Sequence, residues 1–207
     1  MFSKLMVLLV AVVLLYGCQS QADSQNAEQS AKSEQTPPNE QTTVENFTLA
    51  DYNGEEHTLA DYKDSKAIVL MFIATRCPVS NSYNERMAKL YADYHDRGIA
   101  FIGINSNKTE DVEEIKKHAQ EHNLQFTILK DTKNVIADRL DASVTPEIYV
   151  LNSDFNILYH GRIDDSMRAE EVKTRDLRKA LDEILAGKAV NEARTKAFGC
   201  SIKKVSS

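Results

Sequence analysis

The side chain in this sequence that is best suited to chemistry is the thiol of Cys77, in the segment Thr75-Arg76-Cys77-Pro78. Proline is favourable at the first position of a helix, because its missing N–H would have no partner there. The sulfur is therefore expected at a helix start, beside unpaired N–H groups and the positive end of a helix dipole. With Arg76 as a neighbouring cation, these influences favour the nucleophilic thiolate. The alternative is an inert buried cysteine.

The elements around Cys77 follow from the apolar pattern. The run Ala67–Ile73 predicts a strand buried on both faces, directly before the cysteine. Apolar residues at helical spacing after it predict a long helix that ends at Gly98. Further strands are expected over 99–104, 126–129, 147–151 and 157–159, and further helices after Thr109 and over 134–140 and 174–186. This order predicts an α/β fold with a mixed central sheet and helices on both sides.

A second feature near a strand is Val144-Thr145-Pro146, which precedes the strand over 147–151. A proline just before a strand often ends a loop in a cis peptide bond, although a trans turn is the alternative.

Other candidates are weaker. His118 and His122 have a spacing that can hold a metal, but their charged neighbours favour a solvated face, and no metal site is expected. The acidic run 110–114 is likewise expected to be a solvated helix start, capped by Thr109. Arg162 is expected either to reach the active-site face or to form a surface salt bridge.

Charge and cysteine content exclude some classes of protein. The net charge of −6 argues against a nucleic-acid partner, which requires a basic face. Three cysteines are too few for a disulfide framework, so each is expected to have its own role.

The N-terminus accounts for one of these cysteines. Lys4 and the apolar run Leu5–Leu15 are typical of a signal peptide, because the run is shorter than the ~20 residues of a membrane span. Gly17-Cys18 follows and resembles the lipobox of bacterial lipoproteins. That resemblance implies a cleaved peptide over 1–17, a lipid on Cys18 and a membrane-bound envelope protein facing the periplasm or the outside. An uncleaved anchor or a plain secretory signal are the alternatives.

The remaining chain divides into three parts. Residues 19–43 contain no Val, Ile, Leu, Met, Phe or Tyr, which predicts a disordered tether over 18–43. A folded domain is expected over 44–190, and a tail that carries Cys200 over 191–207.

The folded part resembles the thioredoxin superfamily, on its redoxin (alkyl hydroperoxide reductase/thiol-specific antioxidant) side. The segment 47–62 is similar to the N-terminal hairpin of those proteins, 72–77 to their active-site strand and first cysteine, and Thr145-Pro146 to their cis-proline loop. The resemblance covers residues 44–188. It implies a thioredoxin-like three-layer α/β/α sandwich, with Thr145, Pro146 and Arg76 as substrate-binding residues beside the catalytic Cys77.

The sequence also departs from these families. The motif C-x-x-C reads Cys77-Pro-Val-Ser80, so a serine replaces the usual second cysteine. The peroxiredoxin motif is incomplete, because Thr75 is two rather than three residues before Cys77. A peroxiredoxin-like group is more similar: its cysteine is followed by proline and its tail ends in Gly-Cys-Ser-Ile-Lys, here residues 199–203.

That similarity gives Cys200 a possible catalytic role. A cysteine on a mobile tail can attack an oxidised Cys77 and resolve it as a disulfide. A static structural bridge and a bystander thiol are the alternatives.

The sequence therefore predicts a membrane-anchored thiol–disulfide oxidoreductase that needs no cofactor, acts on a thiol or disulfide protein and depends on a partner reductant. One alternative is a thiol peroxidase in which Cys77 reacts with a peroxide substrate. Another is a copper-binding module that uses Cys77 with a histidine, for which the sequence offers only one cysteine at the site.

Overall fold

The computed structural model describes residues 43–205. The expected signal peptide, the lipidation site Cys18 and nearly all of the expected tether lie outside the described residues. Thr43, the last tether residue, forms a bridge to Asn156 and donates its hydroxyl hydrogen to the Asn156 Oδ1 at 2.6 Å. Within the described range, no helix has both the length and the apolar character that crossing a membrane requires.

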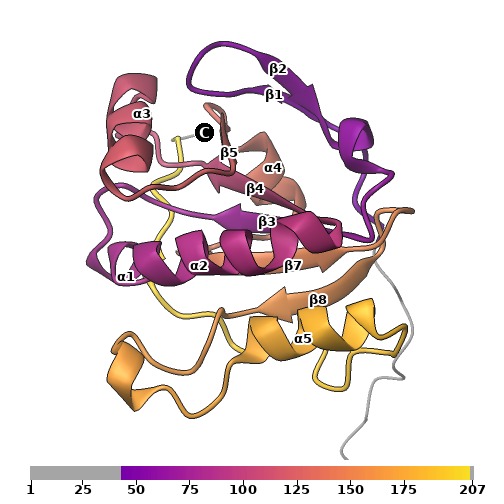
Figure 1. The fold of residues 1–207 in the computed structure, drawn as a ribbon. Helices are drawn as coiled ribbons and strands as arrows, with labels where there is room; N and C mark the ends of the chain where they lie inside the picture. The colour runs from indigo at the N-terminus through magenta and orange to yellow at the C-terminus, as the bar shows by residue number, and fades with distance from the viewer. Residues whose placement is uncertain (1–42, 206–207) are drawn as a thin grey trace, which may run out of the picture. The chain divides into compact units, whose positions relative to one another are not determined.

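A five-stranded sheet lies at the centre of the fold, with the strand order β5-β4-β3-β7-β8 (Figure 1). The central strand β3 (Ala67–Phe72) is buried along its whole length. It pairs in parallel with β4 (Ile99–Asn105), which pairs in parallel with β5 (Thr127–Lys130). On its other side it pairs antiparallel with β7 (Glu147–Leu151), followed by the antiparallel β8 (Ile157–Gly161). The prediction of a mixed sheet is confirmed.

Alternate residues of β3 supply two apolar cores, one on each face of the sheet. Val69 and Met71 pack with residues of α2 (Asn84–Tyr94), α3 (Val112–Glu121) and α5 (Asp176–Leu185). Leu70 and Phe72 belong to the second core, together with residues of α4 (Val135–Arg139). Both faces of the strand are covered, which explains its continuous apolar sequence. The remaining elements are the hairpin β1 (Thr48–Ala50) and β2 (Glu56–Thr58) and the short helices η1 (Leu59–Tyr62), η2 (His95–Arg97) and η3 (Ala169–Glu171).

The long helix expected after Cys77 is in fact two helices. The first, α1 (Pro78–Asn81), is a single turn, and α2 begins only at Asn84. At the break, the Tyr83 side chain is buried and its hydroxyl donates to the carbonyl oxygen of Ser166 at 3.0 Å. The dipole of a long helix therefore does not act on the sulfur of Cys77.

The start of α3 also differs from the prediction. Its N-cap is Asp111, whose carboxylate accepts a hydrogen bond from the N–H of Glu114 at 2.9 Å, so Thr109 is not the cap. Ile115 and Ala119 are buried as expected, whereas Val112 is 37% exposed. Aspartate caps a helix as well as threonine does, so residue type alone does not choose between the two positions.

The described part of the tail packs against the domain instead of extending from it. Figure 1 shows it, in yellow, running from α5 past the carboxyl end of β3. Thr195 donates its N–H to the His160 carbonyl oxygen at 3.0 Å. Further on, Lys203 donates its N–H to the Asn107 side chain at 2.7 Å. The tail thus crosses one end of the central sheet.

Candidate active site

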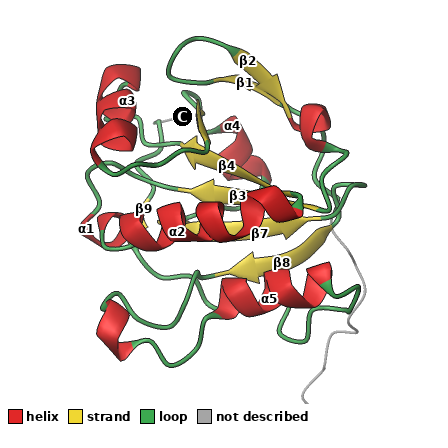
Figure 2. Ribbon diagram, in the orientation of Figure 1, coloured by secondary structure: helices red, strands yellow, loops and turns green. Residues whose placement is uncertain are grey.

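The two cysteines of the folded part are joined to each other by a disulfide, with their Cα atoms 5.9 Å apart. Cys77 is the N-cap of α1 and is only 5% exposed. Cys200 begins the short strand β9 (Cys200–Ser201), which lies beside α1 (Figure 2). The structure therefore brings together the two residues that the sequence identified as redox candidates.

The immediate surroundings of the Cys77 sulfur are two main-chain groups. Ser80 donates its N–H to this sulfur at 3.3 Å. The carbonyl oxygen of Thr145 lies 3.5 Å from the sulfur on another side. In the reduced protein, an N–H donor favours the thiolate, while a carbonyl oxygen can accept the hydrogen of the neutral thiol. One N–H group at the helix start, that of Ser80, thus contacts the sulfur, as expected from the position of Cys77 before the helix.

Arg76 has a partner other than the sulfur. Its side chain is 62% exposed and forms an ion pair with Glu114 of α3, with a distance of 2.9 Å between Arg76 Nε and Glu114 Oε1. The hydrogen bond with Arg76 is the main reason that the pKa of the Glu114 carboxyl lies below its ordinary value, against a smaller effect of burial. The guanidinium charge is therefore compensated by a carboxylate and is a weaker influence on Cys77 than the sequence suggested.

Glu110 is a site residue that the sequence reasoning missed. It was expected on a solvated helix start, but it is 4% exposed. Its Oε2 accepts hydrogen bonds from the N–H of Thr75 at 2.9 Å and from the Asn105 side chain at 2.6 Å. Its Oε1 accepts from the N–H of Arg76 at 3.1 Å. The carboxylate thus fixes the two residues that precede Cys77. Within the acidic run 110–114, Glu110 is therefore buried, although the sequence pattern indicated a solvated segment.

The proline loop lies directly against the disulfide. The Thr145–Pro146 peptide bond is cis. The short strand β6 (Val144–Thr145) pairs antiparallel with β9, and Thr145 stands opposite Cys200. The sequence placed Thr145 and Pro146 beside Cys77, and the structure places Thr145 beside both cysteines.

Glu147, directly after Pro146, is a second buried carboxylate that the sequence did not single out. It accepts hydrogen bonds from the N–H of Ser143 at 2.9 Å and of Val144 at 3.2 Å. His160 Nε2 lies 2.7 Å from its Oε1. Burial raises the pKa of this carboxyl, but the bonds from His160, Ser143 and Val144 together outweigh burial and hold the pKa below its ordinary value. Glu147 therefore fixes the main chain at the start of β6, just as Glu110 fixes the main chain before Cys77.

The weaker candidates have structural partners. His118 was expected on a solvated face, but it is half-buried, its Nε2 lies 3.2 Å from the Asn84 side chain, and burial, aided by nearby His122, lowers its pKa. Arg162 forms a salt bridge with Asp176 at 2.6 Å, as in the second of its two expected roles, but the Asp176 carboxylate is buried, so the pair does not lie on the open surface. Among residues 43–205, the side chains near enough to share a metal ion are those of Asp51, Glu55 and His57, a group that does not include Cys77.

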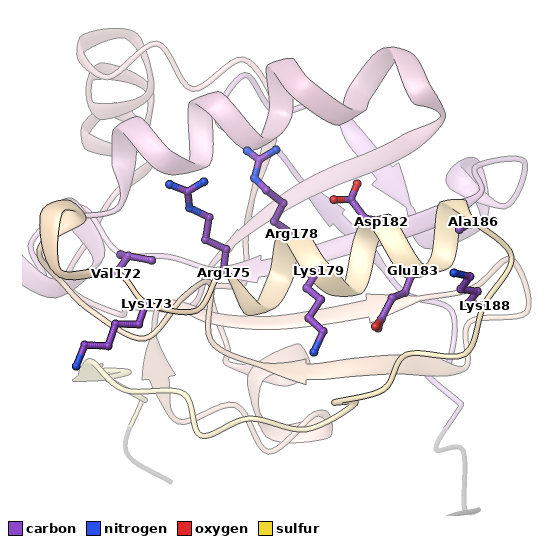
Figure 3. Close-up of a pocket in the computed structure, with 9 residues that line it drawn as sticks. All are labelled: Val172, Lys173, Arg175, Arg178, Lys179, Asp182, Glu183, Ala186 and Lys188. Atoms are coloured by element: carbon purple, nitrogen blue, oxygen red, sulfur yellow. The ribbon is translucent and has the colours of Figure 1, made fainter.

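A surface hollow of the described residues lies elsewhere, along α5. It has a volume of about 730 Å³ and follows α5, where Figure 3 shows Arg175 and Arg178 pointing to one side of the helix and Lys179 to another. It contains none of the residues that surround Cys77. Cys77 itself is buried, so its sulfur lies in a covered site and not in this hollow.

The fold and the site together define a thioredoxin-like protein. A solved structure of a secreted disulfide oxidoreductase from Mycobacterium tuberculosis has the same fold, with a TM-score of 0.52 at 21% identity over 68% of this chain and 95% of that one. The sequence profile of the AhpC/TSA family matches residues 41–165, and the chain belongs to this family.

Two relatives are more similar in sequence. Thiol-disulfide oxidoreductase ResA of Halalkalibacterium halodurans is 28% identical over 118 residues, which are 57% of this chain and 62% of ResA. The match thus covers less than two thirds of that relative. A solved structure of a hypothetical protein from Sinorhizobium meliloti is 33% identical, with a TM-score of 0.74, over 80% of this chain and 94% of that one.

Proposed function

We propose that this chain is a membrane-anchored thiol–disulfide oxidoreductase in which Cys77 is the nucleophile and Cys200 the resolving thiol. The observation that carries the proposal is the disulfide between the two, which joins the first turn of α1 to the tail. Similarity to the thiol-disulfide oxidoreductase ResA supports the same reaction class. The N–H of Ser80, which donates to the Cys77 sulfur at the start of α1, supports the role of Cys77 as the attacking group, because an N–H donor favours the thiolate.

The reaction follows from these two thiols. With both cysteines reduced, the Cys77 thiolate attacks one sulfur of a substrate disulfide, and the substrate's other sulfur leaves as a thiolate that takes up a proton. The Cys200 thiolate then attacks Cys77 and releases the second substrate thiol. The substrate gains two electrons, and the chain is left with the Cys77–Cys200 disulfide. A partner dithiol must reduce this disulfide before the next cycle, and the opposite direction uses the same steps in reverse.

The anchoring part of the proposal comes from the sequence before residue 43. Gly17-Cys18 after an apolar run supports lipidation of Cys18, and the polar segment that follows supports a tether. A tether of this composition has a reach on the order of 25–30 Å, so the thioredoxin-like domain would work close to the membrane surface. The envelope is also a compartment in which a disulfide persists. Incorporation of a labelled fatty acid that is abolished in Cys18→Ala tests this part.

Single-turnover kinetics with a model disulfide test the chemistry. Cys77→Ser should abolish the reaction, and Cys200→Ser should stop it at a mixed disulfide on Cys77 that mass spectrometry detects. The proposal fails if Cys200→Ser turns over at the wild-type rate, or if the wild-type chain does not exchange disulfides.

A peroxidase is the second candidate, and membership of the AhpC/TSA family favours it. In that reaction the Cys77 thiolate attacks a peroxide oxygen, becomes a sulfenic acid and releases an alcohol or water; Cys200 then forms the disulfide and releases water. The ratio of the Cys77 reaction rates towards hydrogen peroxide and towards a model disulfide decides between the two candidates.

A further inference from the structure

The tail is fixed to the domain before Cys200 by contacts with the end of β8. Thr195 donates its N–H to the carbonyl oxygen of His160 at 3.0 Å, and its hydroxyl oxygen accepts the N–H of Arg162, also at 3.0 Å. Between these two partners, Gly161 lies so close to Thr195 that a Cβ atom at the glycine would overlap it. We call Thr195 with these contacts the upstream anchor of the tail.

A second set of contacts fixes the tail after its cysteine. Lys203 donates its N–H to Asn107 Oδ1 at 2.7 Å, and its carbonyl oxygen accepts the N–H of Lys108 at 2.9 Å. Two residues further on, Val205 donates its N–H to Asn134 Oδ1 at 2.7 Å. We call Lys203 and Val205 with these hydrogen bonds the downstream anchor of the tail.

The two asparagines of the downstream anchor belong to buried loops that follow β4 and β5. Asn107 is 4% exposed and Asn134 is 1% exposed. The main chain of Asn107 is held by other groups, because its carbonyl oxygen accepts from Lys130 Nζ at 2.6 Å and its N–H donates to Asn105 Oδ1 at 3.3 Å. Asn134 Nδ2 donates to the carbonyl oxygen of Ser106. Both side-chain oxygens therefore stand at fixed positions, where they meet main-chain N–H groups of the tail.

Both anchors are independent of the disulfide. Their hydrogen bonds join the tail to residues other than Cys77 and Cys200. Reduction breaks the covalent link between the two sulfurs and removes none of these bonds. In the reduced chain, Cys200 is therefore expected to lie in a loop, residues 196–202, that is fixed at both ends.

We infer that Asn107 and Asn134 are positioning residues for the second step of the reaction, because they fix the tail after Cys200 and so keep its thiolate near Cys77. The inference rests on the proposed disulfide exchange and adds two residues that set the rate of its resolving step. A segment fixed at both ends samples less space than a segment fixed at one end, so the effective concentration of its reacting group is higher.

The step concerned is the attack of the Cys200 thiolate on Cys77 in the mixed disulfide. As the bond between the two cysteines forms, the bond between Cys77 and the substrate sulfur breaks, and the substrate leaves as a thiolate that takes up a proton. The earlier attack of Cys77 on the substrate does not use Cys200. Loss of the downstream anchor should therefore slow the second step and leave the first unchanged, a split that a general loss of structure would not produce.

Stopped-flow kinetics of the reduced full-length chain separate the two steps. The probe is a disulfide between a small alkyl thiol and a chromophoric aromatic thiol. The aromatic thiol has the lower pKa and leaves first, so its absorbance follows the attack of Cys77. Acid quenching and peptide mapping by mass spectrometry then follow the loss of the alkyl group from Cys77. Every chain carries Cys18→Ser, which leaves Cys77 and Cys200 as its two thiols.

Asn107→Ala should slow resolution by about fivefold or more, the effect of one lost hydrogen bond, and Asn134→Gly, which suits the positive φ of this position, should do the same. A chain that ends at Ile202 lacks the whole downstream anchor and should resolve more slowly still. Asn107→Asp keeps an acceptor for the N–H of Lys203 and should restore most of the rate. Asn191→Ala, at an exposed position at the start of the tail, is the matched control and should resolve at the wild-type rate.

The outcomes separate the two proposals. If the anchor variants resolve the mixed disulfide as fast as the wild type, the role of Asn107 and Asn134 is wrong and the proposed function stands. Equal slowing of both steps would also overturn it, because the two residues would then act on the structure in general. If the wild-type chain forms no mixed disulfide on Cys77, the proposed function fails, and the inference that rests on it fails too.

Discussion

The carboxylate of Glu110 accepts a hydrogen bond at 3.1 Å from the N–H of Arg76, the residue immediately before Cys77. The same carboxylate also accepts a hydrogen bond from the N–H of Thr75, so one buried group just before α3 fixes two successive peptide units before Cys77. The position of Cys77 therefore depends on a side chain that is distant in sequence.

This relationship predicts the effect of Glu110→Gln. The neutral amide keeps the shape of the side chain but weakens charge-assisted bonds, which are worth about 1.5–3 kcal/mol when a charged group takes part. We expect a loss of ~1–3 kcal/mol in the free energy of unfolding and a slower reaction of Cys77 with a model disulfide. Denaturant unfolding and stopped-flow kinetics measure both effects. Glu113→Gln, at an exposed position of α3, is the control. Equal losses of stability and rate in the two variants would contradict the role of Glu110 in fixing the residues before Cys77.

Reduction of the disulfide should destabilise the domain. Cys77 and Cys200 are 123 positions apart, and cross-links that close long loops typically contribute about 2–4 kcal/mol. Urea unfolding of the reduced protein should show a loss of this size. The Cys200→Ser variant should show the same loss and no further response to a reductant. A wild-type chain that is equally stable in both redox states would mean that the bridge carries no stabilisation.

The hydrogen bonds of Glu147 predict a dependence of stability on pH. Its folded-state pKa lies below the ordinary value of 4.5, so above that value its ionised form stabilises the folded state. As the pH falls through the folded-state pKa the carboxylate takes up a proton, and this contribution is lost. Glu147→Gln should therefore be less stable than the wild type at neutral pH, and the difference should shrink below pH 4.5. A difference that stays constant with pH would locate the effect in packing instead. Denaturant unfolding of both proteins at several pH values between about 3 and 7, a range that includes the titration of carboxylates, measures this difference in stability.

A buried ion pair holds the loop after β8. Arg86 Nη1 lies 2.7 Å from Asp164 Oδ2, and the guanidinium also lies over the Tyr83 ring at 3.7 Å. Removal of one partner leaves an uncompensated buried charge, so Arg86→Ala should cost about 3–5 kcal/mol in the free energy of unfolding. Lys89→Ala removes the exposed pair with Asp93 on the same helix and should cost less than about 1 kcal/mol. Chemical denaturation measures the free energy of unfolding of both variants. Similar decreases in the two would contradict the larger contribution expected from the buried pair.

The sequence predicted the strands of the central sheet well, because β3, β4 and β7 are buried on both faces and carry continuous apolar runs. It also identified Cys77, Cys200 and the proline loop, which have distinctive residue types. It could not identify Glu110 or Glu147, because their roles depend on main-chain N–H groups that only the folded chain brings to them. The break before α2 was missed for a related reason, since the helical spacing of Tyr83 continues unchanged across it.

Ser80, at the place where a second cysteine usually stands, is fully buried, and its hydroxyl accepts the N–H of Ala74 at 3.1 Å. The Ser80 side chain therefore has a structural role in the turn, and the disulfide partner of Cys77 comes instead from β9, the last strand of the chain. Oxidation in this protein covalently joins β9 to Cys77 at the start of α1, so the disulfide holds a distant segment of the chain on the domain, whereas a disulfide between two cysteines of one helical turn would not. We therefore expect the oxidised and the reduced form of the chain to differ in molecular shape as well as in thiol reactivity.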